Sequence, residues 1–96
     1  MHVLCVELQL QMPHVHSLKE KRAALRPVLD RLPKLGVSVS EVGDNDVWKS
    51  ARLGVAVVSG TPRQASEIID EAERIVWGRH DIDVVSAERT WMEIDR

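Results

Sequence analysis

Two helix-start signals, one in each half of the chain, limit the folds that this sequence can adopt. Ser17 is followed three residues later by Glu20, and Thr61 is followed three residues later by Gln64. This spacing is typical of a capping box, in which the hydroxyl and the carboxylate or amide each accept from the other residue's backbone N–H. Pro62 strengthens the second signal because proline is favoured at the first helical position. The sequence therefore predicts two helices with well-defined starts.

The stretches around these helices have the alternation of β-strands. Leu4, Val6, Leu8 and Leu10 are separated by single residues, which places them on one face of a strand. The helices are expected over residues 17–34 and 62–78, and the strands over residues 2–12, 37–42, 53–58 and 81–94. The order β-α-β-β-α-β favours a ferredoxin-like α+β sandwich, a four-stranded antiparallel sheet with both helices on one face. We expect one domain over residues 1–96.

Composition and charge narrow the functional classes. The chain is 44% hydrophobic and 29% charged, which is typical of a soluble globular protein. Its net charge of −2 argues against a general nucleic-acid binder, so such a role would need a local basic patch. The single cysteine, Cys5, excludes an internal disulfide and suits a reducing compartment. Polar residues interrupt the N-terminal apolar segment, and no apolar run is long enough for a membrane span, so we expect a cytoplasmic protein.

Several segments together resemble a known family. They are Leu10 with Pro13, then Ser17-Leu-Lys-Glu-Lys-Arg22, Val37-Ser-Val-Ser-Glu-Val42, Asp46-Val-Trp48 and Leu53-Gly-Val-Ala-Val-Val58. In these segments the chain resembles the YlxP-like family of small bacterial proteins of unknown function. The resemblance implies a ferredoxin-like fold and a gene that often lies beside genes for translation initiation and small-subunit maturation. Genetic association does not define a mechanism. Pro27 departs from the residue usual in the family.

Three cations, Lys19, Lys21 and Arg22, begin the first expected helix. Cations there are disfavoured by about 0.3 to 1 kcal/mol each, because they face the positive pole of the helix dipole. Free N–H groups with converging positive charge are typical of an anion-binding site.

The same three cations have a second interpretation. Lys21 falls on the apolar arc of the helical wheel, so it must reach past the core edge or meet a carboxylate. The cations would then form an ion-pair network inside the fold, with Glu41, Asp44 or Asp46 as partners.

Catalytic and metal chemistry have little support in this sequence. His14 and His16 offer two imidazoles without a third ligand, and Asp44 to Asp46 lacks the later ligands of a calcium loop. Cys5 has no basic neighbour that would activate its thiol. Catalytic triads, P-loops and dinucleotide fingerprints do not occur. We therefore expect a non-enzymatic protein without a metal or cofactor.

Binding to RNA is the leading hypothesis. The chain has no Phe or Tyr, and its strands one and three have no Trp, which excludes base stacking on the central strands of the sheet. Contact with the RNA backbone, with Trp48 stacking beside it, is the remaining mode. The partner would be RNA or a ribosomal assembly intermediate. The predicted anion- or RNA-binding residues are Ser17, Lys19, Lys21, Arg22, Arg26, Trp48 and Lys49.

A structural homo-oligomer or protein-interaction domain is the alternative. Small or apolar residues are expected on the open face of the sheet, namely Val3, Cys5, Gly54, Ala56, Val85 and Ala87. An exposed patch of this kind favours association. A homodimer would form through the open sheet face or along an edge strand, with Trp91 as an anchor.

Overall fold

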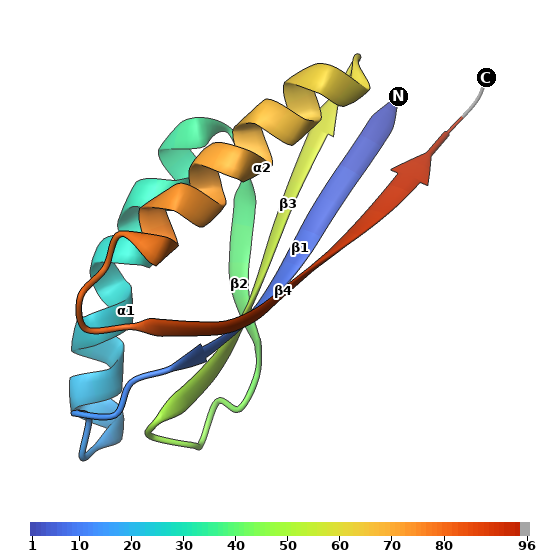
Figure 1. Cartoon of the computed structure of the whole chain (residues 1–96). Helices are drawn as coiled ribbons and strands as arrows, with labels where there is room; N and C mark the ends of the chain where they lie inside the picture. The colour runs from blue at the N-terminus through green and yellow to red at the C-terminus, as the bar shows by residue number, and fades with distance from the viewer. Residues whose placement is uncertain (95–96) are drawn as a thin grey trace.

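The computed structural model describes residues 1–94 and has the predicted order of elements (Figure 1). These are β1 (His2–Gln11), α1 (Leu18–Arg31), the 3₁₀ turn η1 (Leu32–Leu35), β2 (Ser38–Gly43), β3 (Ser50–Ser59), α2 (Pro62–Trp77) and β4 (Asp83–Glu93).

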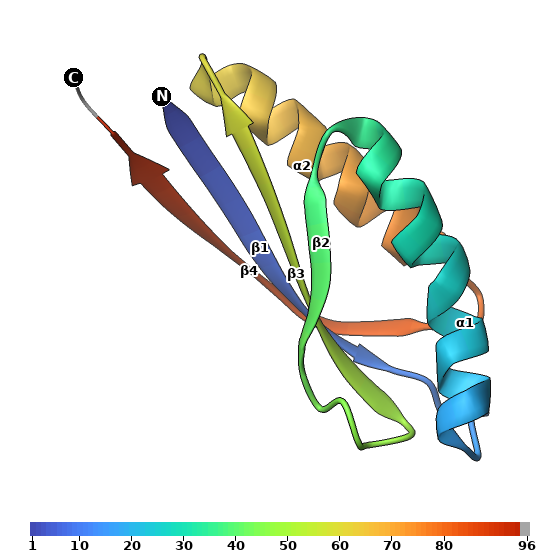
Figure 2. The ribbon, with the colours of Figure 1, turned by 180° about the vertical axis from the view of Figure 1, so that it is seen from behind.

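The strands form one antiparallel sheet in the order β2-β3-β1-β4. Both helices cover the same face of this sheet, and the opposite face has no helix on it (Figures 1 and 2). The predicted ferredoxin-like sandwich is therefore confirmed. The reason is the alternation seen in the sequence, since each strand offers one apolar face that an amphipathic helix must cover.

The core lies between the sheet and the helices. Leu4, Leu8 and Leu10 of β1 have no exposed surface, and neither do Ile69 and Ala72 of α2. The remaining buried hydrophobic residues are Val6, Met12, Val15, Leu25, Val28, Leu32, Val37, Ala51, Leu53, Val55, Val57, Ala65, Ile75, Val76 and Ile82. The open face of the sheet contributes none of its side chains to this core.

The first helix start has the predicted cap with one difference. Ser17 Oγ accepts from the N–H of Glu20 at 3.1 Å. The carboxylate of Glu20 does not return to Ser17 as expected, but accepts from the N–H of His16 at 2.6 Å. Either N–H satisfies the carboxylate, and the one from His16 fixes the entry of the chain into α1.

The end of the first helix is tighter than predicted. The α-helix stops at Arg31, and residues 32–35 continue as a 3₁₀ turn that contains Pro33. Gly36 closes this turn with φ of 85°, a left-handed conformation that costs glycine no steric penalty. The chain then enters β2 directly.

An irregularity between β1 and β4 changes which residues face the helices. Gln9 pairs with Ser86 but Leu10 pairs with Val84, so Val85 is an extra residue at a bulge. Beyond the bulge Ala87 lies opposite the buried Leu8 and shares its face of the sheet.

The same irregularity corrects two expectations. Ala87 is not on the open face, and Trp91, opposite Leu4, also lies on the helix side, where it cannot anchor a dimer through the open face. The sequence-based assignment treated β4 as a regular strand.

Candidate functional site

Lys21 is the most unusual residue in the structure, because only 2% of its surface is exposed. Its ammonium group donates to the carbonyl oxygen of Asp44 at 2.6 Å and to that of Val47 at 2.7 Å. Glu41 Oε2 lies 2.7 Å from the same nitrogen and forms an ion pair outside hydrogen-bond geometry. A buried charge is tolerated only when it is paired and solvated by protein groups, and these three oxygens meet that requirement.

Because Lys21 is buried and paired, it is not available to bind an anion or RNA at the surface. An ammonium group has three N–H donors, and here three protein oxygens surround it. The structure agrees with the alternative prediction in pairing Lys21 with Glu41, but it uses the backbone of Asp44 instead of its carboxylate. Lys21 therefore joins the first turns of α1 to the loop between β2 and β3.

The loop that Lys21 holds is built around Asp44. Asp44 has a φ of 61°, a left-handed conformation that aspartate tolerates better than most residues. Its carboxylate accepts from Gln9 Nε2 at 3.3 Å and from Ser50 Oγ at 3.4 Å. Its carbonyl also accepts from the N–H of Val47 at 3.0 Å. Side chains from α1, β1 and β3 thus fix the turn that leads to Trp48.

The other predicted cations are on the surface. Lys19, Arg22 and Arg26 are exposed along α1, and none of them forms an ion pair within residues 1–94. Residues three and four apart lie on one face of a helix, so the three charges form one row. Ser17 is half-buried, and its hydroxyl caps the helix.

Trp48 and Lys49 lie on the loop between β2 and β3 that Lys21 contacts. Half of the Trp48 surface is exposed, and Lys49 is exposed beside it. The carbonyl of Lys49 accepts from the N–H of Met12 at 2.7 Å, which ties the loop to the end of β1. A shallow depression of about 360 Å³ lies there, lined by Gln11, Pro13, Lys49 and Ser50. We call the set of exposed residues Lys19, Arg22, Arg26, Trp48 and Lys49 the basic end.

A separate charge cluster joins β4 to α2. Arg89 on β4 contacts Asp70 and Glu73 on α2, with 2.7 Å between Nη2 and Asp70 Oδ1. Burial is the largest single influence on the pKa of Arg89 and lowers it, but hydrogen bonds and charge from both carboxylates together raise this pKa. No local pattern predicts this cluster, because Arg89 is 16 and 19 residues from its two partners in the chain.

Within residues 1–94, three or more His, Cys, Asp or Glu side chains do not gather in any arrangement that could hold a metal ion. His14 and His16 are exposed on the loop before α1. In that same part of the chain, neither helix has the length and apolar character needed to cross a membrane.

Comparison with known proteins places this fold in a family. Residues 3–89 match the family described as protein of unknown function, DUF503. The chain belongs to the DUF503 family. A DUF503 relative is the uncharacterized protein YlxP of Bacillus subtilis (strain 168), which is 41% identical over 61 residues. That match covers 62% of this chain and 63% of YlxP, less than two thirds of the relative's length.

A solved structure has the same fold as this chain. The solution NMR structure of a de novo designed protein with ferredoxin fold superimposes with a TM-score of 0.54. The two chains are 17% identical, and the alignment covers 96% of this chain and 84% of the designed one. At this identity the similarity establishes the fold alone.

Sequence reasoning missed the two backbone carbonyls that bind Lys21. Any residue can supply a carbonyl, so Asp44 and Val47 carry no side-chain signal for this role. The available signal was the position of Lys21 on the apolar arc of α1, which required a partner near the end of the sheet.

Proposed function

We propose that this DUF503 protein is a non-enzymatic module that binds RNA through its basic end. The contact of Lys21 with the carbonyls of Asp44 and Val47 carries the proposal, because it joins α1 to the loop of Trp48. Without this contact the first turns of α1 and the loop of Trp48 would be free to move independently of each other. With it the helix that carries the cations and the loop that carries Trp48 hold fixed positions relative to each other.

The chemistry of the basic end suits a phosphate backbone. Lys19, Arg22 and Arg26 offer charge without internal partners among residues 1–94, so binding need not break an ion pair. Arg22 and Arg26 can contact phosphate oxygens in a bidentate manner. Trp48 offers an exposed ring on which an unpaired base can stack. Ser17 sets the start of the helix and thereby positions the cations.

The proposed partner is RNA of a ribosomal assembly intermediate. The family resemblance supports this choice through its association with translation initiation and small-subunit maturation. The overall charge of −2 implies that the contact is local, with a strong dependence on salt. The protein would act in the cytoplasm.

Crosslinking to RNA in cells, followed by separation of ribosomal fractions, tests this function. The informative variant combines Lys19→Glu with Arg22→Glu. Its matched control combines Arg31→Glu with Lys34→Glu, two exposed cations at the other end of the same helical segment. Both variants change the net charge by the same four units, so only position distinguishes them.

We expect crosslinks to one region of ribosomal RNA for the parent protein and the control, and at least a tenfold loss for Lys19→Glu with Arg22→Glu. The melting temperature of this variant should stay level or rise slightly, since neither side chain is in an ion pair among the described residues and the helix dipole disfavours cations at this position. Equal background crosslinking for all three proteins would refute the RNA function. A large fall in melting temperature would instead favour a structural role for the basic turn.

A homo-oligomer is the second candidate, and the exposed edge of β4 favours it. Ten of the eleven residues of β4 are exposed, including Trp91 at 43% and Met92 at 58%. Long exposed edge strands are templates for pairing with another chain. Sedimentation at increasing protein concentration tests this function, with Trp91→Lys as the variant. A dimer that Trp91→Lys abolishes would support it, and a monomer at all concentrations would refute it.

A further inference from the structure

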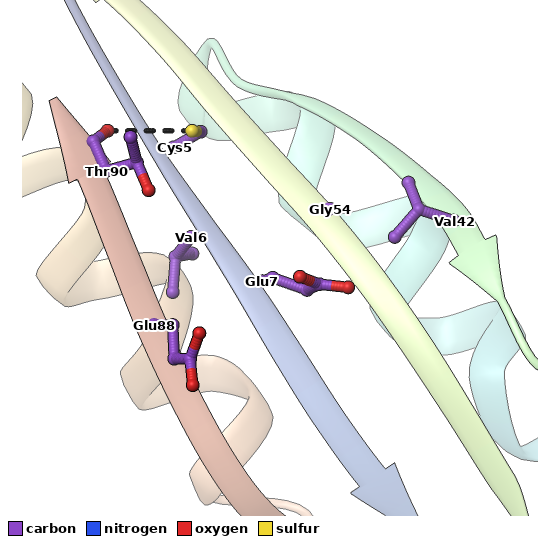
Figure 3. A pocket seen from close by; sticks show the side chains of 7 residues that line it. All are labelled: Cys5, Val6, Glu7, Val42, Gly54, Glu88 and Thr90. Carbon is purple, nitrogen blue, oxygen red and sulfur yellow. Dashed lines mark hydrogen bonds between the residues drawn. The ribbon is translucent and has the colours of Figure 1, made fainter. Parts of the chain in front are cut away.

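A groove with two carboxylates lies on the open face of the sheet, away from the basic end. It measures about 380 Å³ and crosses all four strands (Figure 3). The lining residues are Cys5, Val6, Glu7, Val42, Gly54, Glu88 and Thr90. Figure 3 shows Glu7 extending from β1 towards β3, with Glu88 on the neighbouring β4.

The floor of the groove depends on a missing side chain. A Cβ atom at position 54 would lie 2.9 Å from Cγ1 of Val42 on β2. Gly54 therefore lets Val42 fold over β3 and form one apolar wall. A second depression of about 290 Å³ continues from it along β2, with Cys5, Val42 and Gly54 shared between the two. The groove thus has an apolar floor long enough for more than one side chain.

The charges of the groove are only partly balanced within residues 1–94. Glu7 and Glu88 are direct partners in the β1–β4 pairing. Like charges directly opposite each other on neighbouring strands do not stabilise a sheet. Glu88 has no ion pair within residues 1–94. Glu7 forms an ion pair with Arg52, 3.7 Å from its Nη1, and Nε of the same arginine donates to Gln9 Oε1.

We propose that this groove binds a cationic segment of a protein partner, with an arginine side chain placed between Glu7 and Glu88. A guanidinium group can donate to both carboxylates at once, and its aliphatic stem can pack along Val42 and Cys5. Within residues 1–94 the two carboxylates have a single cationic partner, Arg52, so a cation from a partner can still pair with Glu88.

The negative charge of Glu7 and Glu88 disfavours phosphate, RNA and a second copy of the chain as ligands of the groove. Phosphate or RNA would be repelled by the two carboxylates, so this site is separate from the basic end and does not depend on the proposed function. A second copy of the chain, related by a two-fold axis through the groove, would bring four carboxylates together. A homodimer through this face is therefore disfavoured by the same pair that favours a cationic partner.

Titration of the ¹⁵N-labelled 96-residue chain with short peptides tests the proposal. The probe is acetyl-Gly-Arg-Val-Arg-Gly-amide, and its matched control replaces both arginines with citrulline, which has nearly the same shape but no charge. The variant combines Glu7→Gln with Glu88→Gln. Its control combines Asp30→Asn with Glu67→Gln, which removes the same charge from exposed positions on the helices.

We expect the arginine peptide to shift the amide signals of Glu7, Gly54 and Glu88 with saturation, and the citrulline peptide to bind at least tenfold more weakly. The Glu7→Gln, Glu88→Gln variant should lose at least tenfold in affinity while its melting temperature stays level, because both side chains are exposed. The helix control should bind like the parent protein.

Three results would overturn the proposal. The first is equal binding of both peptides, and the second is a set of shifts confined to surfaces outside the groove or no shifts at all. The third is a fall in melting temperature of the Glu7→Gln, Glu88→Gln variant, which would show that the pair serves the fold. Concentration-dependent shifts in the same signals without peptide would assign the face to a second copy instead.

Discussion

Replacing Lys21 with methionine should show how much one buried charge contributes to this fold. Methionine keeps an unbranched apolar stem but has no ammonium group. Glu41, whose side chain is 23% exposed, would lose its counter-ion, and the carbonyls of Asp44 and Val47 would lose their donor. Breaking one side of a buried ion pair costs about 3 to 5 kcal/mol. Since Glu41 can regain some water, we expect about 3 kcal/mol.

This loss should be measurable by urea unfolding followed by circular dichroism. For a domain of this size, about 3 kcal/mol lowers the melting temperature by roughly 12 to 24 °C. The slope of unfolding free energy against urea should stay constant, which would show that the variant still reaches the same fold. Lys19→Met is the matched control, because Lys19 is exposed and should change stability by less than about 0.5 kcal/mol.

A second substitution separates the charge from the carbonyl contacts. Lys21→Met combined with Glu41→Gln removes the stranded carboxylate and should recover about 1 kcal/mol relative to Lys21→Met alone. In a background that carries Trp77→Phe and Trp91→Phe, soluble quenchers should reduce the fluorescence of Trp48 more strongly once Lys21 is lost. A loss below about 1 kcal/mol, with unchanged quenching of Trp48, would refute the idea that Lys21 holds the loop.

Three further predictions concern the ends of elements and the second charge cluster. Gly36→Ala should cost about 1 kcal/mol because residue 36 has a φ of 85°, whereas Gly60→Ala, at a position with open space, should cost less; thermal unfolding compares the two. Ser17→Ala should cost about 1 kcal/mol by removing the cap, and Ser17→Asp should restore it in the same assay. Arg89→Gln should lower the free energy of unfolding by about 1 kcal/mol, since the ion pairs of Arg89 with Asp70 and Glu73 are partly solvated. The pKa of Arg89 is raised in the folded state, so its contribution is complete below the unfolded value and is lost only as pH rises through the folded one. The cost of Arg89→Gln should therefore be constant between about pH 6 and 9, and a dependence on pH in that window would contradict this assignment.

Local chemistry was enough to determine the elements of this protein and their order. The hydroxyls of Ser17 and Thr61 fix the helix starts, and Gly36 fixes the end of the first helical segment. Alternation along β1 decides which face is buried, because successive side chains of a strand point to opposite sides. These signals depend on residues within four positions of each other, so they can be read without knowing the fold.

Only the tertiary structure decided which charged side chains are buried near the basic end and which line the groove on the open face of the sheet. Lys21 is internal because the left-handed turn at Asp44 brings two carbonyls to its ammonium group, and no side chain in the sequence indicates a carbonyl. Glu7 meets Glu88 because of the register between β1 and β4, and a single bulge at Val85 sets that register. Register depends on pairing between distant segments, where a shift of one residue exchanges the two faces of a strand. The sequence alone therefore determines the layers, and the pairing of β4 with β1 determines which charges each surface presents.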